Sequence, residues 1–213
     1  MKWSALTQKA RENFLSTYHD CGYSANDVIT HYKEDEELKA KGFDIDEIHY
    51  SGFSSQGDGA CWKGRVDLKK YITLNWLAPE VAVKREVILA LLDNDDITPR
   101  VMISLMPSRY SHSNTMQVDD GIEVYFNSRV IIDATGCRDS IFFGAYSQDI
   151  LEAIGGEAFL REVEDEVLSA AKELADTIYK ALEKEYEYQH SEECVSELAE
   201  ANDWDFNEEG EMK

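Results

Sequence analysis

The chain opens with two helical patterns. The first is apolar at every fourth position and predicts a helix over residues 4–20: Leu6, Ala10, Phe14 and Tyr18. The second follows an N-cap signal at Ser24 and predicts a helix that ends at Gly42, since glycine is the usual residue after a helix C-terminus.

The pattern then changes to that of strands. On the segment 60–68, Ala60, Trp62 and Val66 share one face, while polar residues and Cys61 occupy the other. Asp58-Gly59 predicts a tight two-residue turn that joins this strand to a preceding strand near residues 48–53. Gly52, Gly57, Gly59 and Gly64 indicate bulges, or a backbone that another group approaches closely.

Residues 68–77 carry apolar and aromatic side chains at Leu68, Tyr71, Ile72, Leu74, Trp76 and Leu77, and this spacing leaves strand and helix open there. Pro79 predicts the start of a third helix that ends near Asp93. Period-two alternation returns and predicts strands over 101–105, 110–118 and 122–126, and it leaves a further strand over 130–132 open. Pro107-Ser108 and Asp120-Gly121 are the turn signals between the first three of them.

A long helical pattern covers residues 147–190, with a bend at Gly155-Gly156, and Ser191 starts a short last helix. The segment Asp203-Trp-Asp-Phe206 predicts a docking element near the end of the chain. Helices, then strands, then helices favour the α+β class: an antiparallel sheet of four to five strands, with the 48–66 hairpin near its centre, N-terminal helices on one face and a long acidic C-terminal helix. We predict an α+β core domain over 1–146 and an acidic helical region over 147–213.

The chain has a large excess of acidic residues, which bears on the partners that it can bind. The chain has 21 basic and 43 acidic residues, a net charge of −22, and residues 157–213 hold 19 of the acidic residues against 5 basic ones. Such a surface repels nucleic acid and anionic membranes and attracts basic protein surfaces. Because no apolar run approaches the ~18 residues of a membrane span and no signal core follows Met1, we expect a protein of the host-cell cytosol.

Motifs for catalysis or metal binding are weak. Cys21, Cys61, Cys137 and Cys194 form no C-x-x-C pair, and Asp44, Asp46, Glu47 and His49 match no metal-binding spacing. We therefore expect no metal and no cofactor. A nucleophilic pair of Cys61 with His49 or His112 stays open beside the interpretation that all three are packed side chains.

One segment carries a family resemblance. The run Ser-Gly-Phe-Ser-Ser-Gln-Gly-Asp-Gly-Ala-Cys-Trp-Lys-Gly, residues 51–64, resembles a signature of uncharacterised tailed-bacteriophage proteins, some of which carry an antitoxin-like label. Residues 42–48 and 202–210 are similar to the same family. The resemblance implies a phage origin and no established activity.

Two candidate sites follow. The first is a ligand or partner contact around the hairpin, formed by Ser51, Phe53, Gln56, Gly57, Asp58, Gly59 and Trp62. The alternative is that Gln56 and Asp58 only form hydrogen bonds back to the turn backbone. The second is an acidic partner surface on the long helix, formed by Glu162, Glu166, Glu173, Asp176, Glu183 and Glu187; its alternative is an ordinary solvated helix face.

The function that these observations favour is non-enzymatic. We expect a phage-encoded protein that binds and inhibits or redirects a host or anti-phage defence protein with a basic surface, with the acidic helix imitating the phosphates of DNA. The alternative is a protein that binds or cleaves a small nucleotide signal at the Gly-Asp-Gly hairpin. Direct binding of nucleic acid or membrane is not expected. The oligomeric state stays open, including a homodimer through the long helix.

Overall fold

The computed structural model describes residues 1–18, 23–75, 97–126, 129–132 and 156–213. The chain divides into two compact units. Unit 1 contains Met1–Ile29 and Lys180–Lys213, and unit 2 contains Thr30–Tyr179. The predicted domain boundary at residue 146 lies outside the described residues. Unit 1 consists of segments from both ends of the chain.

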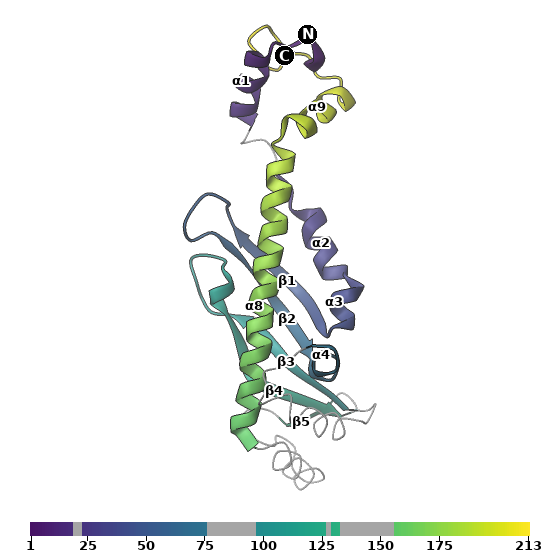
Figure 1. Cartoon of the computed structure of the whole chain (residues 1–213), viewed down its shortest axis with the longest axis vertical. Coiled ribbons are helices and arrows are strands. Elements are labelled where there is room, and N and C mark those ends of the chain that lie inside the picture. Colours follow the sequence, from purple (N-terminus) through teal and green to yellow (C-terminus); the bar gives the residue numbers. More distant parts are fainter. Residues whose placement is uncertain (19–22, 76–96, 127–128, 133–155) are drawn as a thin grey trace. The chain divides into compact units, whose positions relative to one another are not determined.

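Unit 2 is built on a sheet of five antiparallel strands in the order of the sequence (Figure 1). The strands are β1 (Phe43–Ser51), β2 (Gly59–Asp67), β3 (Ile97–Leu105), β4 (Met116–Phe126) and β5 (Arg129–Ile132). The predicted α+β class with an antiparallel sheet is confirmed. The position of the hairpin is different from the prediction, because β1 is an edge strand and pairs with β2 alone.

Both predicted two-residue turns are wrong. The loop between β1 and β2 covers residues 52–58, so Asp58 belongs to a wider loop and Gly59 already pairs with Ser51. Asp120-Gly121 lies inside β4, where the pairing with β3 steps from Val101–Ile122 to Met102–Asp119. Residues on both sides of this dipeptide pair with the same strand, so the two extra residues form a bulge and the chain does not reverse.

Helix α8 (Gly156–Gln189) covers one face of the sheet (Figure 1). Within unit 2 its buried positions recur at intervals of three or four residues: Val163, Val167, Ala171, Ala175 and Ile178. They meet the apolar face of the strands, including Trp62, Val66, Val101 and Ile103, which are all 2% exposed or less. The Trp62 indole N–H donates a buried hydrogen bond of 3.0 Å to the Ala171 carbonyl oxygen, which fixes the helix to β2.

Short helices flank the sheet. The predicted helix from Ser24 to Gly42 is two helices, α2 (Asn26–Glu34) and α3 (Glu36–Ala40), because the Asp35 carboxylate caps α3 by accepting from the Glu37 and Leu38 amides. Helix α4 (Leu68–Leu74) begins after Asp67, whose side chain accepts from the Lys70 amide. The helix expected after Pro79 lies outside the described residues.

Unit 1 has its own core. A short 3₁₀ turn (Trp3–Ala5) precedes α1 (Gln8–Tyr18), and α9 (Glu192–Ala201) is capped by Ser191, as predicted. The buried core residues are Trp3, Leu6, Ala10, Phe14, Val195, Ala199 and Phe206. The Phe206 ring lies edge-on to the rings of Trp3 and Phe14 at centroid distances of 5.6 and 5.2 Å, so the segment around residue 206 is docked into this core.

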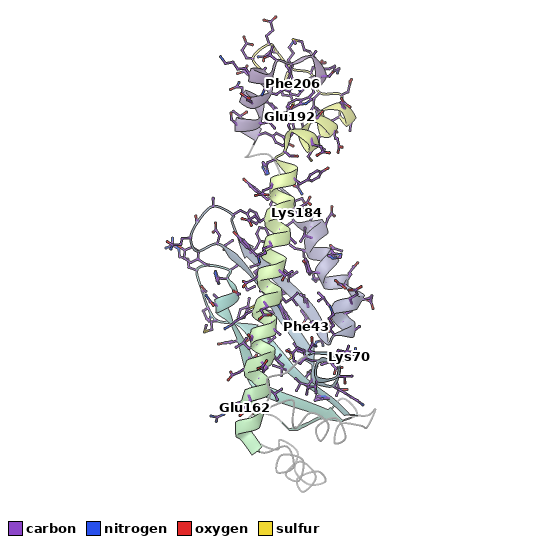
Figure 2. All side chains as sticks on the ribbon, viewed as in Figure 1. Phe43, Lys70, Glu162, Lys184, Glu192 and Phe206 are labelled. Carbon is purple, nitrogen blue, oxygen red and sulfur yellow. The ribbon has the colours of Figure 1, made fainter. Side chains whose placement is uncertain are left out.

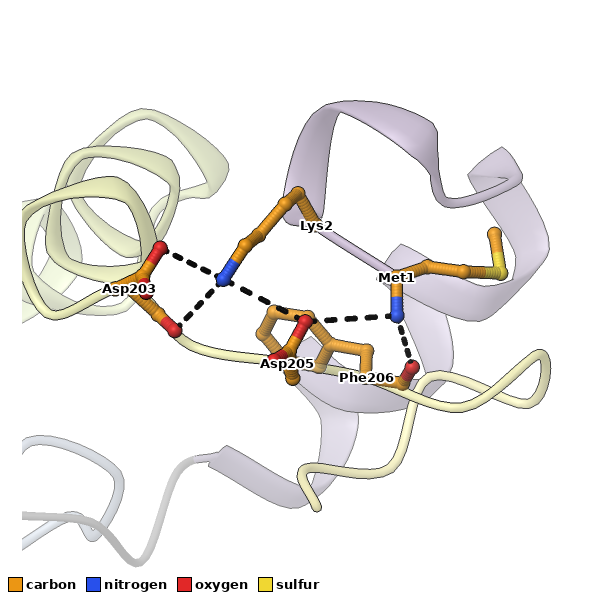
Figure 3. A network of polar contacts seen from close by, with 5 residues as sticks. All are labelled: Met1, Lys2, Asp203, Asp205 and Phe206. Carbon is orange, nitrogen blue, oxygen red and sulfur yellow. Dashed lines mark hydrogen bonds and ion pairs between the residues drawn. The ribbon is translucent and has the colours of Figure 1, made fainter.

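A polar network also joins the chain ends (Figure 3). The amino group of Met1 donates to the Phe206 carbonyl oxygen at 2.6 Å, and the Lys2 ammonium lies 2.7 Å from the Asp203 carboxylate and 3.5 Å from that of Asp205. These side chains are largely exposed, so the apolar core of unit 1 contributes more to stability than the ion pairs do.

Candidate functional site

The β1–β2 loop, residues 52–58, is closed by Asp58. One Asp58 carboxylate oxygen accepts from the backbone amides of Ser54 at 2.8 Å and Ser55 at 2.6 Å. The Asp58 amide returns a bond of 3.0 Å to the Ser55 carbonyl oxygen. Asp58 therefore organises its own loop, whereas the neighbouring Gln56 side chain is exposed.

Aromatic stacking fastens this loop to α8. The Phe53 ring stacks on Tyr50 at a centroid distance of 5.8 Å and on Tyr179 of α8 at 5.7 Å. The Tyr179 hydroxyl also donates to the Gly52 carbonyl oxygen at 3.4 Å. The loop is thus connected to the helix that covers the sheet.

The connection between β3 and β4 lies beside the β1–β2 loop (Figure 1). The Ser51 hydroxyl donates to the Ser111 carbonyl oxygen at 3.1 Å, and the Tyr110 ring is 3.5 Å from the place that a β-carbon on Gly57 would occupy. Tyr110 and Met106 remain 49% and 45% exposed. We call residues 52–58 and 106–112 the two-loop surface, because both loops present side chains to solvent there.

Two residues of the motif lie below this surface. Trp62 has no exposed area, so the expectation that it contacts a ligand or partner is wrong: the indole is part of the core. Cys61 is 2% exposed, and burial raises the pKa of its thiol. His49 and His112, considered above as partners of Cys61, use a ring nitrogen to contact the Glu47 carboxylate and the Asn114 amide, respectively. This geometry favours a packing role for Cys61.

The predicted acidic residues of unit 2 share one face of α8. At about 3.6 residues per turn, Glu162, Glu166, Glu173 and Asp176 fall within roughly 80° of one another, and the buried positions lie on the opposite side. Glu162, Glu173 and Asp176 are exposed and Glu166 is half-buried. We call these four residues the acidic stripe; Figure 2 labels Glu162 near the start of α8. Their Cα positions extend over about 21 Å of the helix at ~1.5 Å per residue.

Ion pairing does not neutralise the stripe within the described part of the chain, where none of its four carboxylates lies in a salt bridge. Its field reaches the core: burial, together with the negative charges of Glu166 and Glu173, raises the pKa of Tyr71 to about 12. Glu183 and Glu187 belong to unit 1, where Glu187 is exposed and Glu183 half-buried.

Sequence reasoning missed Tyr110 and Tyr179. Tyr110 follows the turn signal at Pro107-Ser108, and an exposed aromatic residue next to a turn was an available signal. Tyr179 gave none, because its stacking partner Phe53 is far away in the sequence.

Comparison with known proteins places the chain in a family. The profile of a domain of unknown function, DUF8835, matches residues 25–192. The chain belongs to this family. The matched segment includes the sheet, the two-loop surface and the acidic stripe of this chain, while α1 and the C-terminal segment lie outside it. No curated protein and no solved structure matches the chain.

Clusters of metal-ligating side chains and membrane-spanning helices are both absent from the residues that the structure describes. These residues contain no group of three His, Cys, Asp or Glu side chains arranged to hold a metal ion. Among the described helices, none combines the length and the apolar character needed to span a bilayer.

Proposed function

We propose that this DUF8835 protein is a non-enzymatic, bacteriophage-encoded protein that binds a basic surface of a host or anti-phage defence protein. The observation that carries the proposal is the acidic stripe on the solvent side of α8, whose carboxylates lack cationic partners among the described residues. The motif at residues 51–64 supports the phage origin.

The stripe suits a partner that normally binds nucleic acid. Duplex DNA carries one negative charge per ~1.7 Å of its axis. The stripe is sparser, with four carboxylates over about 21 Å, but all four lie on one face of a single helix. Attraction between such a row and a basic surface accelerates association, and added salt screens it.

The two-loop surface would supply specificity. Tyr110 and Met106 are exposed large apolar residues, and aromatic residues and methionine are enriched in protein interfaces. Gln56 adds an exposed amide beside them. Of the predicted hairpin contacts, Gln56 and Gly57 are the ones that fit this surface best, while Asp58 holds the loop in shape.

Binding or cleavage of a small molecule at the Gly-Asp-Gly hairpin has less support. That function needs a cavity with accessible aromatic walls. Trp62 is fully buried, and the half-buried Phe53 ring already stacks on Tyr50 and Tyr179, so both aromatic residues are engaged within the fold.

Affinity capture tests the proposal. The protein would be expressed in the host and recovered at low and at high salt, next to the variant Glu162→Gln, Glu173→Gln and Asp176→Asn. We expect a stoichiometric host protein with the native chain at low salt, and strongly reduced recovery with the variant.

The matched control removes three carboxylates from the N-terminal helices: Glu12→Gln, Glu34→Gln and Glu37→Gln. All three side chains are exposed, so the change in net charge is the same at a different place. Equal recovery by the two variants, or no stoichiometric partner at low salt, would contradict the proposal.

A further inference from the structure

The connection between β3 and β4 contains a short 3₁₀ turn, Ser113–Thr115, that is held by His112. The ring nitrogen Nδ1 of His112 accepts from the Asn114 amide at 3.1 Å. The His112 carbonyl oxygen accepts from the Thr115 amide at 2.8 Å and from the Thr115 hydroxyl at 2.7 Å. The ring and the backbone of one residue therefore fix the turn from both sides.

His112 also packs against the start of β2, within the motif at residues 51–64. A β-carbon on Gly59 would lie 2.9 Å from the Cδ2 atom of His112 and 3.2 Å from its Cα atom. Both distances are shorter than the usual ~3.5–4.0 Å contact between carbon atoms, so Gly59 leaves the space that the histidine fills. Further along β2, the Cys61 thiol forms hydrogen bonds with the His112 backbone and the Thr115 side chain.

The two exposed apolar residues of the two-loop surface, Met106 and Tyr110, are held through this turn. The Met106 amide donates to the Thr115 carbonyl oxygen at 2.7 Å, and Thr115 is bonded in turn to His112. Tyr110 lies two residues before His112, and the Ser111 carbonyl oxygen between them accepts a hydroxyl of β1 at 3.1 Å. The position of both exposed side chains therefore depends on the turn.

The hydrogen bond from the Asn114 amide requires a lone pair on Nδ1 of His112. A backbone amide can only donate, so the ring must be neutral with its proton on Nε2. A proton on Nδ1 would turn the acceptor into a donor that faces the Asn114 N–H, and this bond could not form. The Ser113 hydroxyl, 3.3 Å from Nδ1, can rotate to accept the new proton, but the amide cannot. Histidine is the side chain that ordinarily changes its charge between about pH 5 and 8.

Among the described residues, no ion pair includes His112. The titratable side chains of its own connection and of the strands packed against it are Arg109, Tyr110, Cys61, Lys63, His49 and Glu47. Burial raises the pKa of the Cys61 thiol, which is therefore neutral in the range where histidine titrates. The one carboxylate of this set, Glu47, already contacts His49 at 3.1 Å and Lys63 at 3.5 Å. These groups do not replace the bond that protonation of His112 removes.

We propose that His112 is the positioning residue of the two-loop surface, and that its neutral ring keeps Met106 and Tyr110 in place. Uptake of a proton by the ring releases the Ser113–Thr115 turn, so the surface is ordered at neutral pH and loosened in acid. The consequence for partner binding rests on the proposed function, in which this surface supplies specificity. The effect on the turn is a property of the chain alone.

Amide hydrogen exchange of the full chain, measured by NMR without any partner, tests the proposal. The ring resonances of His112 show when the proton is taken up, and dividing each rate by the intrinsic rate removes the direct effect of pH. We expect the protection of the Asn114 and Thr115 amides to fall at least ~3-fold between about pH 7.5 and about pH 5.

Two variants separate the hydrogen bond of His112 from its packing. His112→Asn retains a neutral acceptor that caps the turn, and protection should stay high at both pH values. His112→Leu fills the space without an acceptor, and protection should be low already at about pH 7.5. The matched control, His31→Gln, removes a histidine whose side chain is 69% exposed, and it should respond to pH as the native chain does.

Three results would overturn the proposal. They are unchanged protection of the native chain after the His112 ring is protonated, native protection in His112→Leu at about pH 7.5, and loss of the pH response in His31→Gln. The first needs no variant to fold. Because no partner is present, a failure of the proposed function leaves the outcome of this test unaffected.

Discussion

At the scale of single residues, the glycines of the β1–β2 hairpin have different tasks. Gly64 pairs with Ile45 beside a bulge in β1, and a β-carbon there would overlap the Asp44 carbonyl oxygen. Gly57 lies in the loop, where a β-carbon would meet the Tyr110 ring at an ordinary 3.5 Å. The signature at residues 51–64 therefore combines Gly64, which the sheet requires, with Gly57, where a larger side chain can be accommodated.

The first prediction compares these two positions. Gly64→Ala should lower the free energy of unfolding by about 1–3 kcal/mol, because backbone atoms in a paired strand must move. Gly57→Ala should change it by less than ~0.5 kcal/mol. Urea denaturation measures the free energy of unfolding of both variants. An equal loss of stability in the two would contradict the close approach of the β1 backbone to Gly64.

A second prediction concerns Asp58. Asp58→Ala removes the acceptor of the Ser54 and Ser55 amides and should cost about 1 kcal/mol. Asp58→Asn retains one oxygen and should cost less. Hydrogen exchange should become faster at these two amides in the alanine variant. Unchanged exchange there would contradict the role of Asp58 in closing the loop.

At the scale of elements, the effect of α8 on α4 shows how the charges of one helix act on a side chain of another. Tyr71 of α4 is 3% exposed, and burial together with Glu166 and Glu173 of α8 raises its pKa from 10.0 to about 12. The folded protein therefore holds the phenol proton at pH values where the unfolded chain has lost it.

The third prediction follows from that shift. The contribution of Tyr71 to stability is complete below pH 10 and should be lost as the pH rises from 10 to about 12, a change of about 2–3 kcal/mol at ~1.36 kcal/mol per pKa unit. Denaturation curves of the native chain and of Tyr71→Phe, recorded across this range, isolate the effect because other titrating groups are common to both. Parallel pH profiles would contradict it.

Elements with a clear period and a capping residue were predictable from the sequence. Strand β3 and helix α9, with its Ser191 cap, are examples. Local turn signals were less informative: Asp120-Gly121 carries the residues of a tight turn, yet pairing of both flanks with β3 makes it a bulge. Asp35 falls inside the single helix predicted between Ser24 and Gly42, yet its carboxylate caps the start of a second helix.

At the scale of the whole molecule, the two ends of the chain form one unit. Phe206 has no exposed area and lies against Trp3 and Phe14, so a core is built from residues about 200 positions apart in the sequence. Each helix alone showed its apolar face, but nothing in a periodic pattern says which distant segment covers that face. The candidate site had the same limit: the motif marked the β1–β2 loop, whereas Tyr110 and Tyr179 come from other parts of the chain.

The fourth prediction tests the division into units. Phe206→Ala should destabilise unit 1 by about 3–5 kcal/mol, as expected for a buried phenylalanine. Tyr188→Ala, at a position 44% exposed in the same unit, should cost less than ~1 kcal/mol. Native-state hydrogen exchange should show lost protection in α9 and retained protection in β3. Equal loss in both elements would contradict a separate unit 1.

The salt dependence of partner binding tests the central claim most directly. The affinity of the captured partner would be measured over a series of salt concentrations for the native chain, for the stripe variant Glu162→Gln, Glu173→Gln and Asp176→Asn, and for the control Glu12→Gln, Glu34→Gln and Glu37→Gln. We predict a steep fall of affinity with salt for the native chain and the control, and a weaker, flatter dependence for the stripe variant. Identical slopes for all three proteins would contradict an acidic contact surface on α8 and would direct attention to the two-loop surface instead.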